Sequence, residues 1–129
     1  MRKRVRDAAI GLALVIASAG AAAAAESVPP AAMADAEAIF RARCTMCHGS
    51  GGRGDGPAGA ALSPRPRDMT DPTWQASVTD AHIETVILGG GPADGRSPLM
   101  PANPDLKTKP DVIKALRQIV RGFAAKTPP

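Results

Sequence analysis

The sequence predicts a small all-α domain in which three main helices are separated by long loops. Apolar residues at helical spacing, with helix start and stop signals, occur in about 34–43, 80–88 and 110–122. The intervening segments 49–77 and 89–109 are rich in Gly and Pro and show neither a helical nor a strand period. A chain of 129 residues allows one small domain and excludes a multidomain enzyme.

Residues 1–25 have the pattern of a signal peptide for export. A basic start precedes an apolar run over 8–16 and a tail of small residues that ends at Ala25. An uncleaved membrane anchor is the alternative because 8–25 contains no charge, but its second half is nearly all Ala and Gly. We expect cleavage after Ala25, which leaves residues 26–129 as one domain in the periplasm.

The net charge of +4 does not indicate a nucleic-acid partner. The signal-like segment holds four of the 16 basic residues and one of the 12 acidic residues, so the rest of the chain has a net charge of only +1. That part also has few large apolar side chains for its length. We therefore expect its loops to wrap a group that supplies the missing apolar volume.

Both cysteines lie in the segment 44–48, which reads CTMCH. A disulfide would close only a tiny loop, and a thioredoxin-like pair would need a strand before Cys44. A zinc site from Cys44, Cys47, His48 and His82 lacks the usual spacing of structural zinc ligands. The pattern is typical of covalent haem attachment. On one helical turn both thiols and the imidazole share a face, so they can reach two vinyl groups and the iron.

Two further segments extend the pattern, Gly-Asp-Gly-Pro at 54–57 and Ser-Pro-Leu-Met-Pro at 97–101. Together with CTMCH they resemble the small soluble bacterial monohaem cytochromes c, over essentially the whole chain after the signal peptide. The resemblance implies a cytochrome c-like fold wrapped around one haem c, attached through both cysteines. It also implies that the first and last helices cross, which would put Phe40 against Leu116 and Val120.

The candidates for the sixth iron ligand are Met69, Met100 and His82. Pro98 and Pro101 hold the chain around Met100 extended, which suits a ligand because little entropy is lost on binding. An apolar gap-filling role is the alternative for this methionine. The resemblance favours Met100, since family members carry the distal Met in such a loop between the last two helices. We expect Met69 to contact the haem and His82 to lie on the surface, with bis-His ligation through His82 as the alternative.

Other residues are expected to surround the haem. A ligating His usually donates its second N–H to a carbonyl, and the resemblance implies a Pro carbonyl after the attachment motif. We assign Pro66, with Pro64 and Pro57 as alternatives. Arg67 and Trp74 are expected to pair or hydrogen-bond with the haem propionates. A solvated basic loop is the alternative for the arginine.

The resemblance implies electron transfer. With His48 and Met100 both on iron, no position is open for oxygen or substrate, and the thioether favours the ferrous state. No Ser-His-Asp set or paired carboxylate is evident, so we expect no enzyme. We expect a carrier, or the cytochrome subunit of a redox enzyme, that docks a dehydrogenase, reductase or oxidase through the exposed haem edge. A haem catalyst or gas sensor, in which Met100 dissociates, is the alternative.

The final third of the chain is rich in basic residues, which are expected either to steer an acidic partner or to form an ordinary solvated helix face. They are Lys107, Lys109, Lys114, Arg117, Arg121 and Lys126. After cleavage of the signal peptide we expect no stable membrane insertion.

Overall fold

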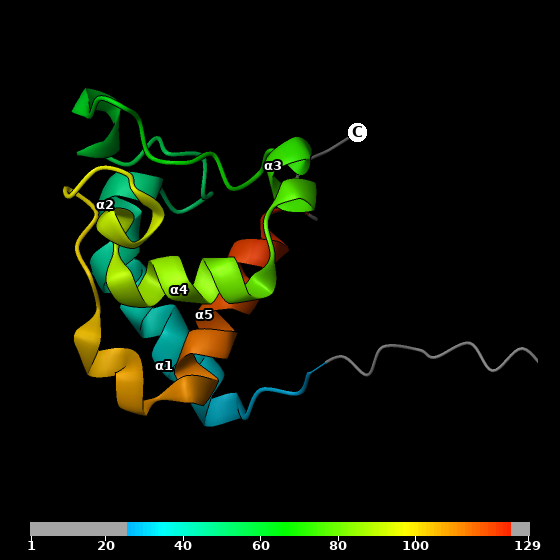
Figure 1. The fold of residues 1–129 in the computed structure, drawn as a ribbon. Helices are drawn as coiled ribbons and strands as arrows, with labels where there is room; N and C mark the ends of the chain where they lie inside the picture. Colours follow the sequence, from blue (N-terminus) through cyan, green and yellow to red (C-terminus); the bar gives the residue numbers. More distant parts are fainter. Residues whose placement is uncertain (1–25, 125–129) are drawn as a thin grey trace, which may run out of the picture.

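The computed structural model describes residues 26–124, so the predicted signal peptide and Lys126 lie outside the described residues. The described part is helical and contains no strand, which confirms the all-α prediction (Figure 1). In chain order the elements are α1 (Pro30–Ile39), the π-helical turn η1 (Phe40–Cys44), α2 (Thr45–His48), η2 (Gly59–Ala61), α3 (Pro72–Ser77), α4 (Asp80–Gly89), η3 (Gly91–Asp94), η4 (Pro104–Thr108) and α5 (Pro110–Gly122). No helix within residues 26–124 has both the length and the apolar character needed to cross a membrane.

The last helix, α5, packs against both α1 and α4 (Figure 1). Its apolar residues face inward, and Leu116 and Val120 belong to the same buried cluster as Phe40. The ring of Phe40 is paired with Phe123, at a centroid distance of 5.5 Å and an interplanar angle of 43°. Burial of each such large apolar side chain is worth about 1.5–3 kcal/mol. The predicted contact between the first and last helices is therefore the centre of the core.

The first helix differs from the predicted segment 34–43. It begins earlier, at Pro30, because proline is well suited to the first turn of a helix. It also does not end before the CTMCH motif: the Thr45 N–H donates to the Phe40 carbonyl across a π-helical turn, and the helical path continues to His48. Gly49, at φ +75°, then ends it. The motif is thus presented by the end of one nearly continuous helix.

The other two predicted helices are confirmed, as α4 and α5. Thr79 caps α4, since its hydroxyl accepts from the His82 N–H at 3.1 Å. The predicted loop 49–77 is not wholly irregular, because it contains the short helix α3. Asp71 caps this helix by accepting from the first backbone N–H groups, and Pro72 fills its first position.

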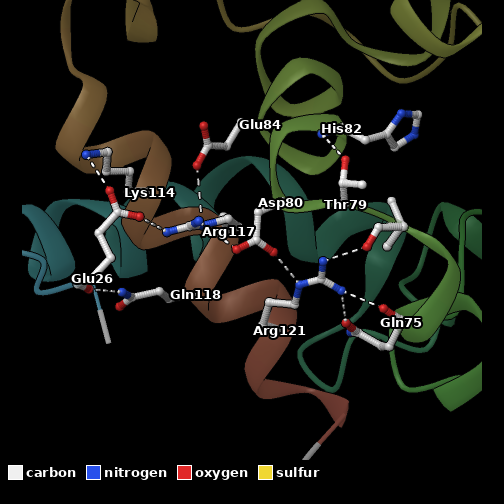
Figure 2. Close-up of polar contacts among 11 residues, drawn as sticks. Glu26, Gln75, Thr79, Asp80, His82, Glu84, Lys114, Arg117, Gln118 and Arg121 are labelled. Atoms are coloured by element: carbon white, nitrogen blue, oxygen red, sulfur yellow. Dashed lines mark hydrogen bonds and ion pairs between the residues drawn. The ribbon is translucent and has the colours of Figure 1, made fainter. Parts of the chain in front are cut away.

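A network of ion pairs joins α4 and α5 to the start of the described chain (Figure 2). The nearly buried guanidinium of Arg117 contacts three carboxylates: Asp80 at 2.7 Å, Glu26 at 2.7 Å and Glu84 at 3.3 Å. Removing this guanidinium would take a cation from all three carboxylates at once, which is costly where they are screened from water.

Two more of the basic residues singled out in the sequence belong to this network. Lys114 pairs with Glu26 at 2.6 Å, and Arg121 pairs with Asp80 at 2.8 Å. These cations are therefore engaged inside the domain, and a partner protein would have to compete for them.

Acidification is expected to weaken the domain through Glu26. Hydrogen bonds from Lys114 and then Arg117 hold the pKa of this carboxyl below its ordinary value of 4.5. A carboxylate with a depressed folded-state pKa stabilises the fold above its unfolded pKa, and this contribution is lost as the pH falls through the folded value. Glu26→Gln should therefore lower the thermal midpoint at neutral pH and flatten its fall below pH 4.5.

The measurement is the thermal midpoint of the holoprotein as a function of pH. Glu37→Gln is the control, because Glu37 is exposed and its pairing with Arg41 of the next helical turn is a loose one, at 3.9 Å. Identical pH profiles for the two variants would contradict the role of Glu26.

Candidate functional site

A cavity of about 520 Å³ lies between the CTMCH segment, the loop 62–69, α4 and the loop 91–101. This is within the usual range of cofactor pockets, about 300–1,000 Å³. All the site residues expected from the sequence line it, although they come from distant parts of the chain: Cys44, Cys47, His48, Pro66, Arg67, Trp74 and Met100. The apolar face of α4, with Ile83, Val86 and Ile87, forms one wall.

His48, the last residue of α2, is buried, with 8 % of its surface exposed. Burial lowers the pKa of the imidazole, and the backbone of Arg67 acts in the opposite direction. No hydrogen bond of good geometry reaches its Nδ1 atom. A buried polar nitrogen without a partner is costly, so the ring is suited to a group that binds it.

The backbone group that affects His48 belongs to Arg67, one residue after the predicted Pro66. The Pro66 carbonyl oxygen instead lies directly against Gly54. The assignment of Pro66 as the acceptor for His48 stays a prediction.

The two cysteines are half-buried and are not joined in a disulfide. Burial raises the pKa of the Cys44 thiol to about 11, the neighbouring Arg43 lowers it in part, and Cys47 adds to the rise. A thiol in this state stays protonated at neutral pH and does not act as a ready nucleophile. Among residues 26–124, no cluster of three or more His, Cys, Asp or Glu side chains is arranged to hold a metal ion, which leaves the zinc alternative without support.

The loop 91–101 brings Met100 to the cavity. The Met100 carbonyl accepts from the Gly91 N–H at 3.0 Å, and the Met100 N–H donates to Ser97 at 3.3 Å. Met100, Met69 and His48 also border a second, smaller cavity of about 50 Å³. The two methionine candidates therefore both reach the space beside the imidazole, and Met69 is the more buried of the two.

A protein-family comparison bears on this arrangement. The family model described as "Cytochrome c" matches residues 33–117, which span the CTMCH segment, the cavity loops and most of α5. The chain belongs to the cytochrome c family. A search of the curated proteins finds no match.

Membership means that this cytochrome binds haem c covalently through Cys44 and Cys47 and that its chemistry is haem-based electron transfer. The residues present fit that group. Both thiols and a buried imidazole with an unpartnered nitrogen line one cavity of suitable volume, whose walls are largely apolar. A large apolar macrocycle would fill the interior that the sequence leaves short of apolar side chains.

Two side chains at the mouth of the cytochrome's cavity are those expected near the propionates. The guanidinium of Arg67 lies 6.0 Å from the centre of the Trp74 ring, within the range of a cation–π contact. Both line the cavity. Stacking holds the guanidinium in place while leaving its N–H donors available to an anion.

His82 is half-exposed, as expected of a surface residue, but it also borders the cavity. Its Nε2 atom lies 3.3 Å from Asp94, whose carboxylate also pairs with Arg96 at 2.6 Å. Arg96, and to a lesser extent His82, lower the pKa of Asp94. The imidazole is thus engaged with the loop that carries Met100.

The cavity wall also contains residues that sequence reasoning missed, among them Arg43 and Asn103. Arg43 directly precedes Cys44, and Asn103 follows Met100 by three positions. This proximity to the attachment motif and to the methionine loop was the signal that could have found them.

Proposed function

We propose that this cytochrome c is an exported, periplasmic electron carrier, either free or as the cytochrome subunit of a redox enzyme, whose haem iron is held by His48 and Met100. One observation carries the proposal: an imidazole and a thioether from segments about fifty residues apart border the same two cavities, both of which are lined by Cys44 and the larger also by Cys47. Haem, when bound there, supplies a one-electron iron couple.

The chain's own residues would then determine the reorganisation and the reduction potential of that couple. His48 is fixed by its place at the end of α2 and by burial, so little reorganisation of the imidazole is needed when the charge changes. The thioether of Met100 favours the ferrous state and raises the reduction potential. If His48 and Met100 both held the iron, substrate would have no site on it, and no enzymatic step is proposed for the chain itself.

The route to a redox partner is proposed at the mouth of the cavity. Leu99 lines the cavity and is 59 % exposed, so the cavity reaches the surface beside an apolar side chain. An apolar contact at this edge would bring a partner within electron-transfer distance without a permanent complex.

Export is proposed from the pattern of residues 1–25. The contacts of Glu26 with α5 support a folded domain that starts directly after the expected cleavage site. N-terminal sequencing of the protein from a periplasmic extract should give Glu26 as the first residue. Retention of the basic start in the exported protein would contradict cleavage.

Absorption spectroscopy of the oxidised holoprotein tests the ligation. For a carrier we expect a thioether-to-iron band in the ferric protein. We also expect that the reduced protein does not bind carbon monoxide. Carbon monoxide binding without that band would favour a haem catalyst or gas sensor with an open sixth position.

A further inference from the structure

Arg43 makes its main contacts far along the chain. Although it is the residue directly before Cys44, its Nη1 and Nη2 atoms donate to the two carboxylate oxygens of Asp105, each at 3.0 Å. Nη1 also donates to the Oδ1 atom of Asn103 at 3.1 Å. Such a two-pronged contact fixes the direction of the guanidinium as well as its distance, which a single ion pair does not do.

Asn103 connects this contact to α4. Its side-chain Nδ2 donates to the Ile87 carbonyl at 2.8 Å, and its backbone N–H donates to the Leu88 carbonyl at 2.9 Å. These carbonyls belong to the last turn of α4, where the helix itself provides no partners. Asn103 therefore links the end of α4, the start of η4 and the guanidinium beside the attachment motif.

Met100 lies within the span of chain that these contacts enclose. Upstream, Gly91 donates to the Met100 carbonyl, and downstream, Asn103 and Asp105 are fixed within five residues of it. Pro101 stiffens the chain between Met100 and Asn103. A displacement of Asn103 would therefore displace Met100 as well.

We propose that Arg43, Asn103 and Asp105 form a clamp that positions the Met100 loop against the segment carrying Cys44 and His48. The clamp joins the two halves of the site, since Arg43 and Asn103 both line the cavity that Cys44, His48 and Met100 line. The three are positioning residues that act through Met100. The inference rests on the proposed ligation by His48 and Met100.

We expect the clamp to control local opening of the Met100 loop more than the overall stability of the domain. The side chains of Arg43 and Asp105 are 44 % and 51 % exposed, and pairs with this exposure add little to overall stability. The same contact is the direct link between the methionine loop and the attachment helix, so its loss should raise the population of molecules in which the loop has moved off the iron.

The test uses imidazole as a probe that competes with the thioether for the ferric iron of the holoprotein. Arg43→Met keeps the apolar part of the side chain and removes the guanidinium. We expect it to raise the apparent affinity for imidazole by about threefold to fivefold, corresponding to the upper range of exposed ion pairs. Asp105→Ala should have a similar effect, and the double variant should add little to either one.

Arg41→Met is the matched control. Arg41 lies in the same helical turn and also has a carboxylate partner, but that partner is Glu37 of the adjacent turn, at 3.9 Å. Its replacement should leave imidazole affinity unchanged. Equal affinities in the Arg43→Met, Asp105→Ala and unmodified proteins, or an equal rise in the Arg41→Met protein, would overturn the clamp.

Two checks separate a failure of the clamp from a failure of the proposed ligation or of folding. If Arg43→Met fails to yield holoprotein, Asp105→Ala tests the same contact from the exposed η4 side, and unchanged imidazole affinity there overturns the proposal. If the unmodified ferric protein lacks the thioether band, the ligation by Met100 is wrong and the clamp falls with it. If that band is present but the clamp variants behave like the unmodified protein, only the clamp is wrong.

Discussion

Replacing Met100 by alanine is expected to leave the haem attached while lowering the reduction potential of the cytochrome. The covalent links come from Cys44 and Cys47, so attachment does not depend on the distal side. Loss of the thioether would remove the proposed ligand, which favours the ferrous state. We expect a fall on the order of 0.1 V, a fraction of the roughly 0.8 V range over which axial ligands tune haem. Redox titration measures it.

The same variant should lose the ferric thioether-to-iron band and should bind carbon monoxide when reduced. Met69→Ala is the control, because Met69 also lines the cavity and is 7 % exposed. It should keep the band and lose stability instead, by about 2–5 kcal/mol, since a buried side chain is replaced by a cavity. If the band were instead lost in Met69→Ala and kept in Met100→Ala, the ligand would be Met69.

The features that could be predicted from the sequence are those that depend on neighbouring residues. The CTMCH spacing fixes the attachment chemistry locally, and helical spacing of apolar residues located α4 and α5 within about one residue. The methionine loop could be found because prolines restrict the chain around Met100. For the same reason, Asp71 and Pro72 would have predicted α3 had the capping pattern been read inside the Gly- and Pro-rich segment.

The features that could not be predicted depend on contacts between distant segments. Arg43 and Asp105 meet across sixty-two positions, and nothing in either local sequence indicates the other. Arg117 and Arg121 suggested a surface for a partner, yet they are held by carboxylates of Glu26 and Asp80. Opposite charges on a helix predict pairing within about one turn; pairing between elements follows only from the way the helices pack.

Gly54→Ala is expected to destabilise the domain strongly because Gly54 lies where the attachment segment meets the loop 62–69. Its backbone has φ +73°, and its N–H donates to the His48 carbonyl at 2.9 Å. A Cβ atom would overlap the carbonyl oxygen of Pro66. The left-handed conformation costs an alanine about 1–2 kcal/mol, and relief of the overlap adds about 1–3 kcal/mol.

The expected consequence is a fall of about 10–25 °C in the thermal midpoint of the holoprotein, at roughly 5 °C for each kcal/mol in a domain of this size. Gly51→Ala is the control three residues away, because Gly51 is exposed and a Cβ there meets no atom within 4 Å. Equal midpoints for the two variants would show that the loop can shift away from Gly54. In that case the loop 62–69 would not be held rigidly beside the segment that follows His48.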